Sequence, residues 1–370
     1  MKFTFPHMGN TYVSVKVLLD TMGVDYEMPP LCNKKTLEYG TKNSPEFICL
    51  PFKTVIGDII QGLEKGADVV IFGGGCGQCR FGYYGDLLNE ILKSLGYKFE
   101  YIHLNFSSMS YIDIVKKVKS VIKNISIFKL FWAVVLSIRT VFLVDKLYKK
   151  ANYIRCRELE KGATDKIIKN FKAEILNAKG YKKVRWLIVN SIKAIKNIQT
   201  NKDENPIKIA IVGEIFIACE PFTNLDIEKK LGEMGVEVHN HLSISDWIYE
   251  HFILNLIPFR QKNKAHIAAR EFINTDDIGG HGIETIGNSI LSIKKGYDGI
   301  IHLYPFTCMP EIVAQSAFGE IQKKYEVPMM SLIIDELSGE AGYVTRIEAF
   351  VDMLKIKKSI ENADLCEVSI

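Results

Sequence analysis

Short apolar runs that alternate with longer helical patterns constrain the fold of this chain most strongly. The clearest runs are residues 67–72 (ADVVIF), 207–212 (IKIAIV) and 299–304 (GIIHLY), and each leads into a loop that contains glycine or proline. Buried strands separated by helical stretches pair in parallel, with the helices as crossover connections. The sequence therefore predicts an α/β protein built on parallel sheets.

The pattern changes twice along the 370 residues, which is enough chain for two ordinary domains. Residues 1–107 predict an N-terminal α/β domain. Residues 108–200 are basic and helical without interruption by strands, so they predict a helical insertion or cap. A polar run at 200–206 (TNKDENP) reads as a linker, and residues 207–370 predict a C-terminal α/β domain that echoes the first.

Charge and hydropathy exclude some classes of function. A net charge of +4 on 90 charged residues gives no argument for nucleic-acid binding. The first residues lack the apolar core of a signal peptide, which favours the cytoplasm. Residues 125–144 have the length of a membrane span, but Lys129 and Arg139 lie inside them, and a charge in the bilayer is costly. We expect a buried amphipathic helix and no membrane span there, and a helix that lies at or crosses a membrane is the alternative.

The cysteines are the strongest functional signal. In a chain without a secretion signal, cysteines are thiols, metal ligands or redox groups rather than disulfides. Six of the eight are predicted in loops, several directly after an apolar strand, where ligands bind parallel sheets. These are Cys32, Cys49, Cys76, Cys79, Cys219 and Cys308. Loops that converge on one place can supply the thiolates of an iron–sulfur cluster.

Other interpretations of the cysteines stay open. A free cysteine often fills core volume, and we expect this of Cys156, on a helix, and of Cys366, near the end of the chain. Cys76 and Cys79 form a C-x-x-C pair, which also suits a redox dithiol or half of a zinc site. A zinc site would need a second close pair, and the remaining cysteines are scattered singly.

Five segments resemble one family. They are CLPFK (49–53), GGGCGQCRFGYYGDL (73–87), RELEKGATD (157–165), YPFTCMPE (304–311) and DELSGEAGYVTRIEAFVDML (335–354). Together they resemble the 2-hydroxyacyl-CoA dehydratase group, and more narrowly its stand-alone members described as CoA-substrate-specific enzyme activase-related proteins. The resemblance spans most of the chain.

The resemblance implies two flavodoxin-like domains with an iron–sulfur cluster in the cleft between them. The cluster would be [4Fe–4S], or the [8Fe–9S] double cubane of a related branch that reduces small molecules. Related proteins form dimers and receive low-potential electrons from a separate ATP-hydrolysing activase. Carried over by position, Cys49, Cys76 and Cys308 match best, Cys32 and Cys219 follow, and Cys79 is the least certain.

The expected function is therefore an activase-dependent reductase or dehydratase component, with an unidentified small-molecule substrate. The alternative is a non-catalytic electron-transfer or cluster-carrier protein that docks through residues 108–200. The chain shows no nucleotide-binding motif, so it is not expected to be the ATPase itself. No catalytic residue can be read from the sequence; Glu311 and Glu336 are candidates for proton donors or for structural carboxylates.

Overall fold

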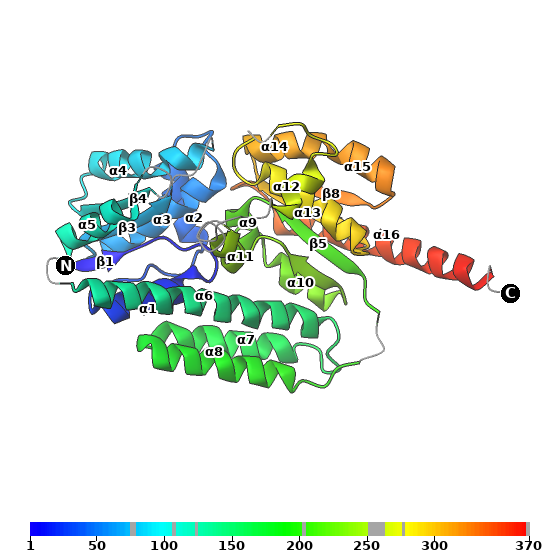
Figure 1. Ribbon diagram of the computed structural model, residues 1–370, viewed down its shortest axis with the longest axis horizontal. Helices are drawn as coiled ribbons and strands as arrows, with labels where there is room; N and C mark the ends of the chain where they lie inside the picture. The colour runs from blue at the N-terminus through cyan, green and yellow to red at the C-terminus, as the bar shows by residue number, and fades with distance from the viewer. Residues whose placement is uncertain are drawn as a thin grey trace.

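Two four-stranded parallel sheets, separated along the chain by a long helical region, form the protein (Figure 1). The computed structural model describes residues 1–74, 79–105, 109–122, 125–201, 205–250, 263–275 and 278–367, without the side chains of Tyr111 and residues 362–367. The predicted α/β class with parallel sheets is confirmed.

The first sheet has the strand order β2-β1-β3-β4. Its strands are β1 (Lys2–Thr4), β2 (Asp25–Tyr26), β3 (Val69–Gly74) and β4 (Glu100–Asn105). The connecting helices are α1 (Thr11–Met22), α2 (Lys34–Lys42), α3 (Leu50–Glu64), the 3-10 turn η1 (Arg80–Tyr83) and α4 (Tyr84–Ser94). The register pairs Phe3 with Val69 and Val69 with Glu100. Helices cover both faces, so the central strands are apolar throughout.

The second sheet repeats this order as β6-β5-β7-β8. Its strands are β5 (Lys208–Gly213), β6 (Glu237–Asn240), β7 (Gly299–Pro305) and β8 (Met329–Ile334). Its helices are α9 (Ile215–Cys219), α10 (Ile227–Glu233), α11 (Ile244–Ile248), α12 (Lys264–Ala269), α13 (Gly282–Lys294), α14 (Met309–Ser316), α15 (Phe318–Tyr325) and α16 (Glu340–Glu367). The architectural echo predicted between the two units is thus present in the strand order.

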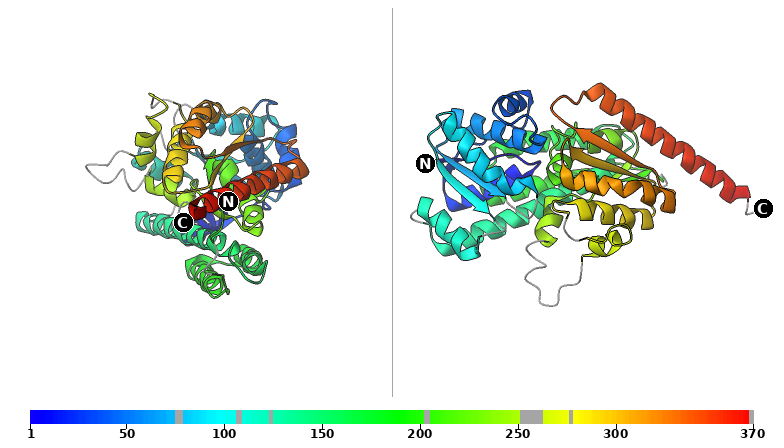
Figure 2. Two further views of the ribbon diagram at one scale, coloured as in Figure 1. Left: turned by 90° about the vertical axis from the view of Figure 1, so that its right-hand side faces the viewer. Right: turned by 90° about the horizontal axis from the view of Figure 1, so that it is seen from above.

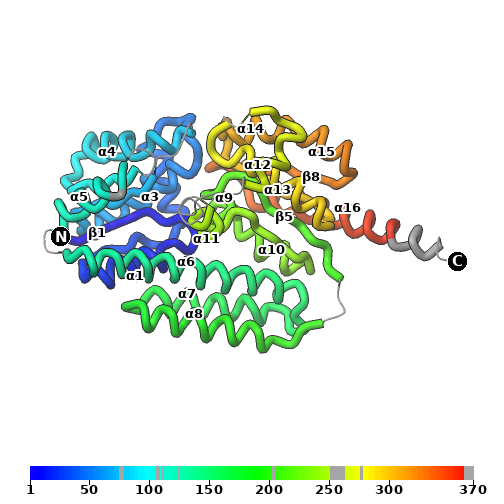
Figure 3. Tube along the Cα trace, viewed as in Figure 1, coloured from blue at the N-terminus to red at the C-terminus, as the bar shows by residue number. Residues whose placement is uncertain are grey.

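The helical region consists of α5 (Tyr111–Val121), α6 (Ile127–Arg155), α7 (Ala163–Asn177) and α8 (Gly180–Lys196). The trace in Figure 3 shows α6, α7 and α8 running back and forth beside one another. They share one apolar core with α1 and β1. This core joins the helical region to the first sheet. The domain boundaries at 107 and 200 remain a prediction.

Helix α6 corrects one expectation. It is a helix, as predicted, but its first turns are not buried: Phe128 is 71% exposed and Phe131 59%. Only the opposite face, with Leu130 and Ala133, packs into the shared core. At the other end of the molecule, α16 projects from the second sheet and carries the C-terminus away from the body (Figure 2).

Candidate functional site

The two sheets face each other with their carboxyl ends, and Arg80 joins them. Arg80 follows β3, and its guanidinium donates to the carbonyl oxygen of Phe47 at 3.1 Å. It also donates to the carbonyl oxygen and the hydroxyl of Thr307, at 2.6 and 2.9 Å, directly after β7. One side chain therefore holds three loops together. Each loop carries a cysteine: Cys79 is next to Arg80, Cys308 is next to Thr307, and Cys49 lies two residues after Phe47.

Those cysteines occupy equivalent positions at the starts of helices. Cys49 precedes α3, Cys308 precedes α14, and Cys79 precedes η1. In both longer helices the cysteine is followed by a proline two residues later, Pro51 and Pro310, which fits the first turn because its missing N–H would have no partner there. The positive end of the helix dipole favours negative charge at these sulfurs.

Burial dominates the electrostatics of the three thiols. It raises the pKa of Cys49, Cys79 and Cys308, and Glu214 raises each of these pKa values further. The backbone N–H groups of Phe81 and Glu311 act in the opposite direction, because each donates a hydrogen bond to a cysteine sulfur. A reactive dithiol needs a lowered thiol pKa, and the surroundings of these three thiols act in the opposite direction.

Two buried polar groups support the cysteine loops. The Tyr84 hydroxyl and the Cys49 sulfur form a hydrogen bond. Below Cys308, the Glu311 carboxylate accepts hydrogen bonds from His302 Nε2 at 2.8 Å and from the Thr285 hydroxyl at 2.9 Å. His302 and Glu311 are both fully buried.

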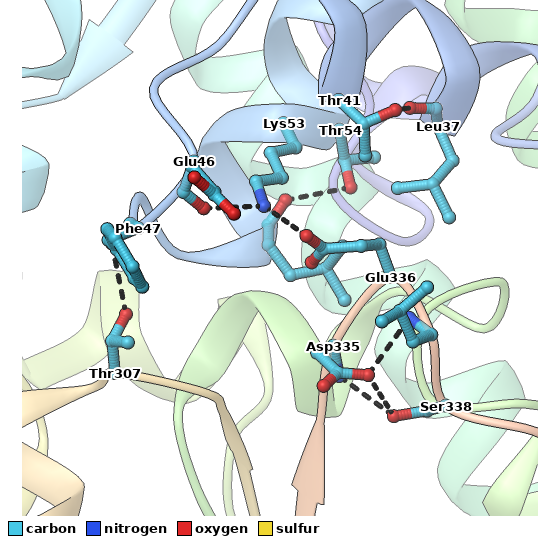
Figure 4. A network of polar contacts seen from close by, with 12 residues as sticks. Leu37, Thr41, Glu46, Phe47, Lys53, Thr54, Thr307, Asp335, Glu336 and Ser338 are labelled. Carbon is cyan, nitrogen blue, oxygen red and sulfur yellow. Dashed lines mark hydrogen bonds and ion pairs between the residues drawn. The ribbon is translucent and has the colours of Figure 1, made fainter.

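A second bridge between the sheets lies near the contact of Thr307 with Phe47 (Figure 4). Lys53, on α3, forms an ion pair with Glu336, in the loop after β8, and also donates to the carbonyl oxygen of Glu46 at 3.0 Å. The Lys53 side chain is only 3% exposed. Glu336 thus has a structural partner, which agrees with one of its two predicted roles.

Cys32 lies among different neighbours. Its sulfur is 3.6 Å from the nearer Asp58 carboxylate oxygen, and Asp58 also accepts the backbone N–H of His7 at 2.8 Å. Burial is the main cause of the raised pKa of Cys32, and Asp58 and Glu220 add to it. Burial likewise raises the pKa of Glu220 to about 7. The carboxyl groups that act on Cys32 are thus different from Glu214 and Glu311, which act on Cys79 and Cys308.

Cys219 corrects another expectation, because it ends the short helix α9 instead of lying in a loop. Its thiol donates to the carbonyl oxygen of Leu242 at 2.7 Å. It lines a cavity of about 680 Å³ between the helical region and the second sheet, within the size range of small-molecule sites. The cavity walls are of mixed charge, with Lys169 and Lys172 on α7 and Glu228 on α10.

The other three cysteines are Cys76, Cys156 and Cys366. Cys76 lies outside the described residues, three positions before Cys79. Cys156 is fully buried at the end of α6, as expected of a core cysteine. The chain at Cys366 is helical, but its side chain lies outside the described part.

A single metal ion and a multi-iron group place different demands on these residues. In the described ranges, no three His, Cys, Asp or Glu side chains are close enough to hold one metal ion. In a cluster each thiolate binds a different iron, so its ligands do not converge on one point. Three thiols at helix starts, of which Cys49 and Cys308 are buried and Cys79 is half-buried, are donors of the type that such a cluster binds.

Sequence reasoning missed Arg80, Tyr84 and Glu214. Arg80 and Tyr84 lie inside the segment quoted around the C-x-x-C pair, but their partners are distant in sequence. Glu214 directly follows the strand run IKIAIVG, so the rule that placed cysteines at strand ends could have found it. In sequence comparisons, neither a protein-family model nor a curated protein matches this chain.

Proposed function

We propose that the chain binds a [4Fe–4S] cluster between its two sheets, with Cys49, Cys79 and Cys308 as ligands and Cys76 as the fourth. The observation that carries this is the Arg80 bridge, which brings cysteine loops from both sheets to one place. Four thiolates complete a cluster of this type. The [8Fe–9S] alternative would need Cys32 and Cys219 as well, and both have other partners.

The reaction we propose is that of a low-potential reductase or dehydratase component, reduced by a separate ATP-dependent activase. When bound, the cluster would supply an electron at low potential. The chain supplies the enclosure: Arg80, with Lys53 and Glu336, holds the sheets together over the cysteines. The strand order of each sheet supports two flavodoxin-like domains, since it follows the doubly wound pattern in which ligands bind at strand ends.

Glu214 gives this site a group that can hold a proton. Burial raises the pKa of its carboxyl to about 7, although its oxygens accept the N–H groups of Phe216 and Ile217. At neutral pH the protonated and ionised forms of Glu214 are therefore both populated. We propose that this carboxyl exchanges protons beside the cysteines when charge develops there.

Iron and acid-labile sulfide analysis of anaerobically purified protein tests the proposal. We expect about four irons and four sulfides per chain. Cys49→Ser and Cys308→Ser should each lose most of this iron, whereas Cys156→Ser, a buried control at the end of α6, should keep it. Colourless protein with about one zinc per chain would select the zinc alternative and refute the proposal.

A further inference from the structure

Helix α6 begins with an apolar face that no described part of the chain covers. Ile127, Phe128, Phe131 and Trp132 are between 40% and 71% exposed and follow one side of the first two turns. The most apolar window of this helix is long enough to cross a membrane, and only 22% of it is buried. Exposed apolar surface of this extent, rimmed by polar side chains, marks an interaction site.

The start of α8 adds an aromatic residue and positive charge at the same end of the helical region. Because α6, α7 and α8 run up, down and up, the first turns of α6 and α8 lie at one end (Figures 1 and 3). Trp186 is 53% exposed there, and Lys183 lies 4.4 Å above its ring. We call this end, with the exposed turns of both helices, the aromatic end.

The cations at the aromatic end are available to a partner. Lys129, Lys182, Lys183 and Arg185 are all exposed, and across the described ranges none of them forms an ion pair. Residues 108–200 as a whole hold 21 Lys and Arg against 6 Asp and Glu, a net charge of +15, whereas the whole chain carries +4. The partner of this surface should therefore be negatively charged as well as apolar.

We propose that the aromatic end binds the surface of a membrane that contains anionic lipid. Phenylalanine, tryptophan and isoleucine side chains enter the boundary between headgroups and acyl chains, while lysine and arginine stay at the phosphates. A symmetric contact with a second copy is disfavoured, because it would place these cations against their own counterparts. This inference does not depend on the proposed cluster.

The packing of α6 limits the proposal to the membrane surface. Its opposite face, including Leu130, Ala133 and Val144, belongs to the core shared with α1, and the Ser137 hydroxyl donates to the carbonyl oxygen of Ser14 at 3.0 Å. A membrane-spanning α6 would have to leave this core. Only the exposed face can enter lipid while the protein stays folded.

Vesicle sedimentation tests this with the full chain. We expect the full chain to bind vesicles made of equal parts of phosphatidylcholine and phosphatidylglycerol, and to bind vesicles of pure phosphatidylcholine weakly. Raising NaCl from about 0.1 to about 1 M should weaken binding, since the Debye length falls from about 10 to about 3 Å. Phe128→Ser/Phe131→Ser should lower the partition coefficient about tenfold or more, since two inserted aromatic side chains are lost.

Matched control variants distinguish membrane binding by the aromatic end from a general effect of removing exposed apolar side chains. Ile356→Ser/Ile360→Ser removes two equally exposed side chains from α16 and should leave vesicle binding unchanged. Lys182→Glu/Lys183→Glu should weaken binding only to the anionic vesicles. The proposal is overturned if the wild-type chain stays in the supernatant with anionic vesicles, if the phenylalanine variant binds as well as wild type, or if light scattering shows that the aromatic end instead joins two copies.

Discussion

Arg80 shows how one residue can define a site that its own segment does not reveal. Its two partner residues, Phe47 and Thr307, are 33 and 227 positions away in sequence. Thr307 has a positive φ of 69°, which is strained for a β-branched residue. Three hydrogen bonds from Arg80 and Thr307 hold this conformation directly before Cys308.

His7 predicts a loss of stability in acid. Burial lowers its pKa from 6.5 to about 4, although Nε2 lies 2.9 Å from the carbonyl oxygen of Pro29. The unfolded chain therefore binds one more proton than the folded chain between pH 4 and 6.5, so stability falls as the pH drops through this window. The shift corresponds to about 3 kcal/mol.

Urea unfolding at several pH values between 4 and 7 measures this effect. His7→Gln keeps a hydrogen-bond donor but does not titrate, so the part of the pH dependence that belongs to His7 should disappear. An unchanged slope of stability against pH in this variant would show that His7 is not responsible.

The sequence could predict that several cysteines lie in loops, but not which residues surround each of them. Cys49 lies in the loop after α2, so the strand-end rule does not account for it. Strand-end position places Cys79 and Cys308 in the loops after β3 and β7, where the structure has them. It failed for Cys219, since the residues after Gly213 turn at once into the helix α9. For Cys32 the deciding neighbours, Asp58 and Glu220, come from distant segments that no local pattern connects.

At the scale of elements, two glycines determine how α2 packs on α3. A Cβ on Gly57 would overlap the carbonyl oxygen of Thr36, and a Cβ on Gly40 would overlap that of Lys53. The backbones of the two helices therefore approach closely, and this fixes the start of α3, where Cys49 lies.

Gly57→Ala should lower the free energy of unfolding by about 2 to 3 kcal/mol, because backbone atoms cannot yield to the added methyl group. Gly319→Ala is the matched control in α15. A Cβ there meets no atom within 4 Å, so better helix propensity should stabilise the protein by up to about 1 kcal/mol. Denaturant unfolding compares the two, and equal effects would contradict the close approach of α2 and α3.

The elements themselves were largely predictable from apolar periodicity, and the sheets and the helical region follow the expected order. Helix α6 was the exception. Its apolar residues are spread around the helix, so the sequence could not reveal that α1 covers one side and leaves Phe128 and Phe131 exposed. Which side is covered depends on tertiary packing.

At the scale of the whole molecule, buried polar bridges hold the two sheets together. Lys53 and Glu336 form one of them, and the Glu336 side chain is 28% exposed. Gly9 donates its backbone N–H to Glu220 at 2.8 Å and forms another. These bridges fix how the carboxyl ends of the two sheets face each other. The repeated strand order alone does not determine this arrangement.

Glu336→Gln should destabilise the protein by about 2 kcal/mol, because it removes the counter-charge of the buried Lys53 ammonium group and leaves it with neutral acceptors only. Glu233→Gln, which breaks an exposed ion pair with Lys229 on α10, should cost less than about 0.5 kcal/mol. Thermal or urea unfolding gives both values. A Glu336 effect no larger than that of Glu233 would show that the bridge does not hold the sheets.

The central claim is that cysteines from both sheets bind one cluster. The electron paramagnetic resonance spectrum of the anaerobically reduced protein tests it most directly, with Cys49→Ser from the first unit and Cys308→Ser from the second. We expect both substitutions to alter or abolish the same low-temperature signal, and Cys32→Ser to leave it unchanged. If either Cys49→Ser or Cys308→Ser leaves the signal as in wild type, a cluster shared between the two sheets is contradicted.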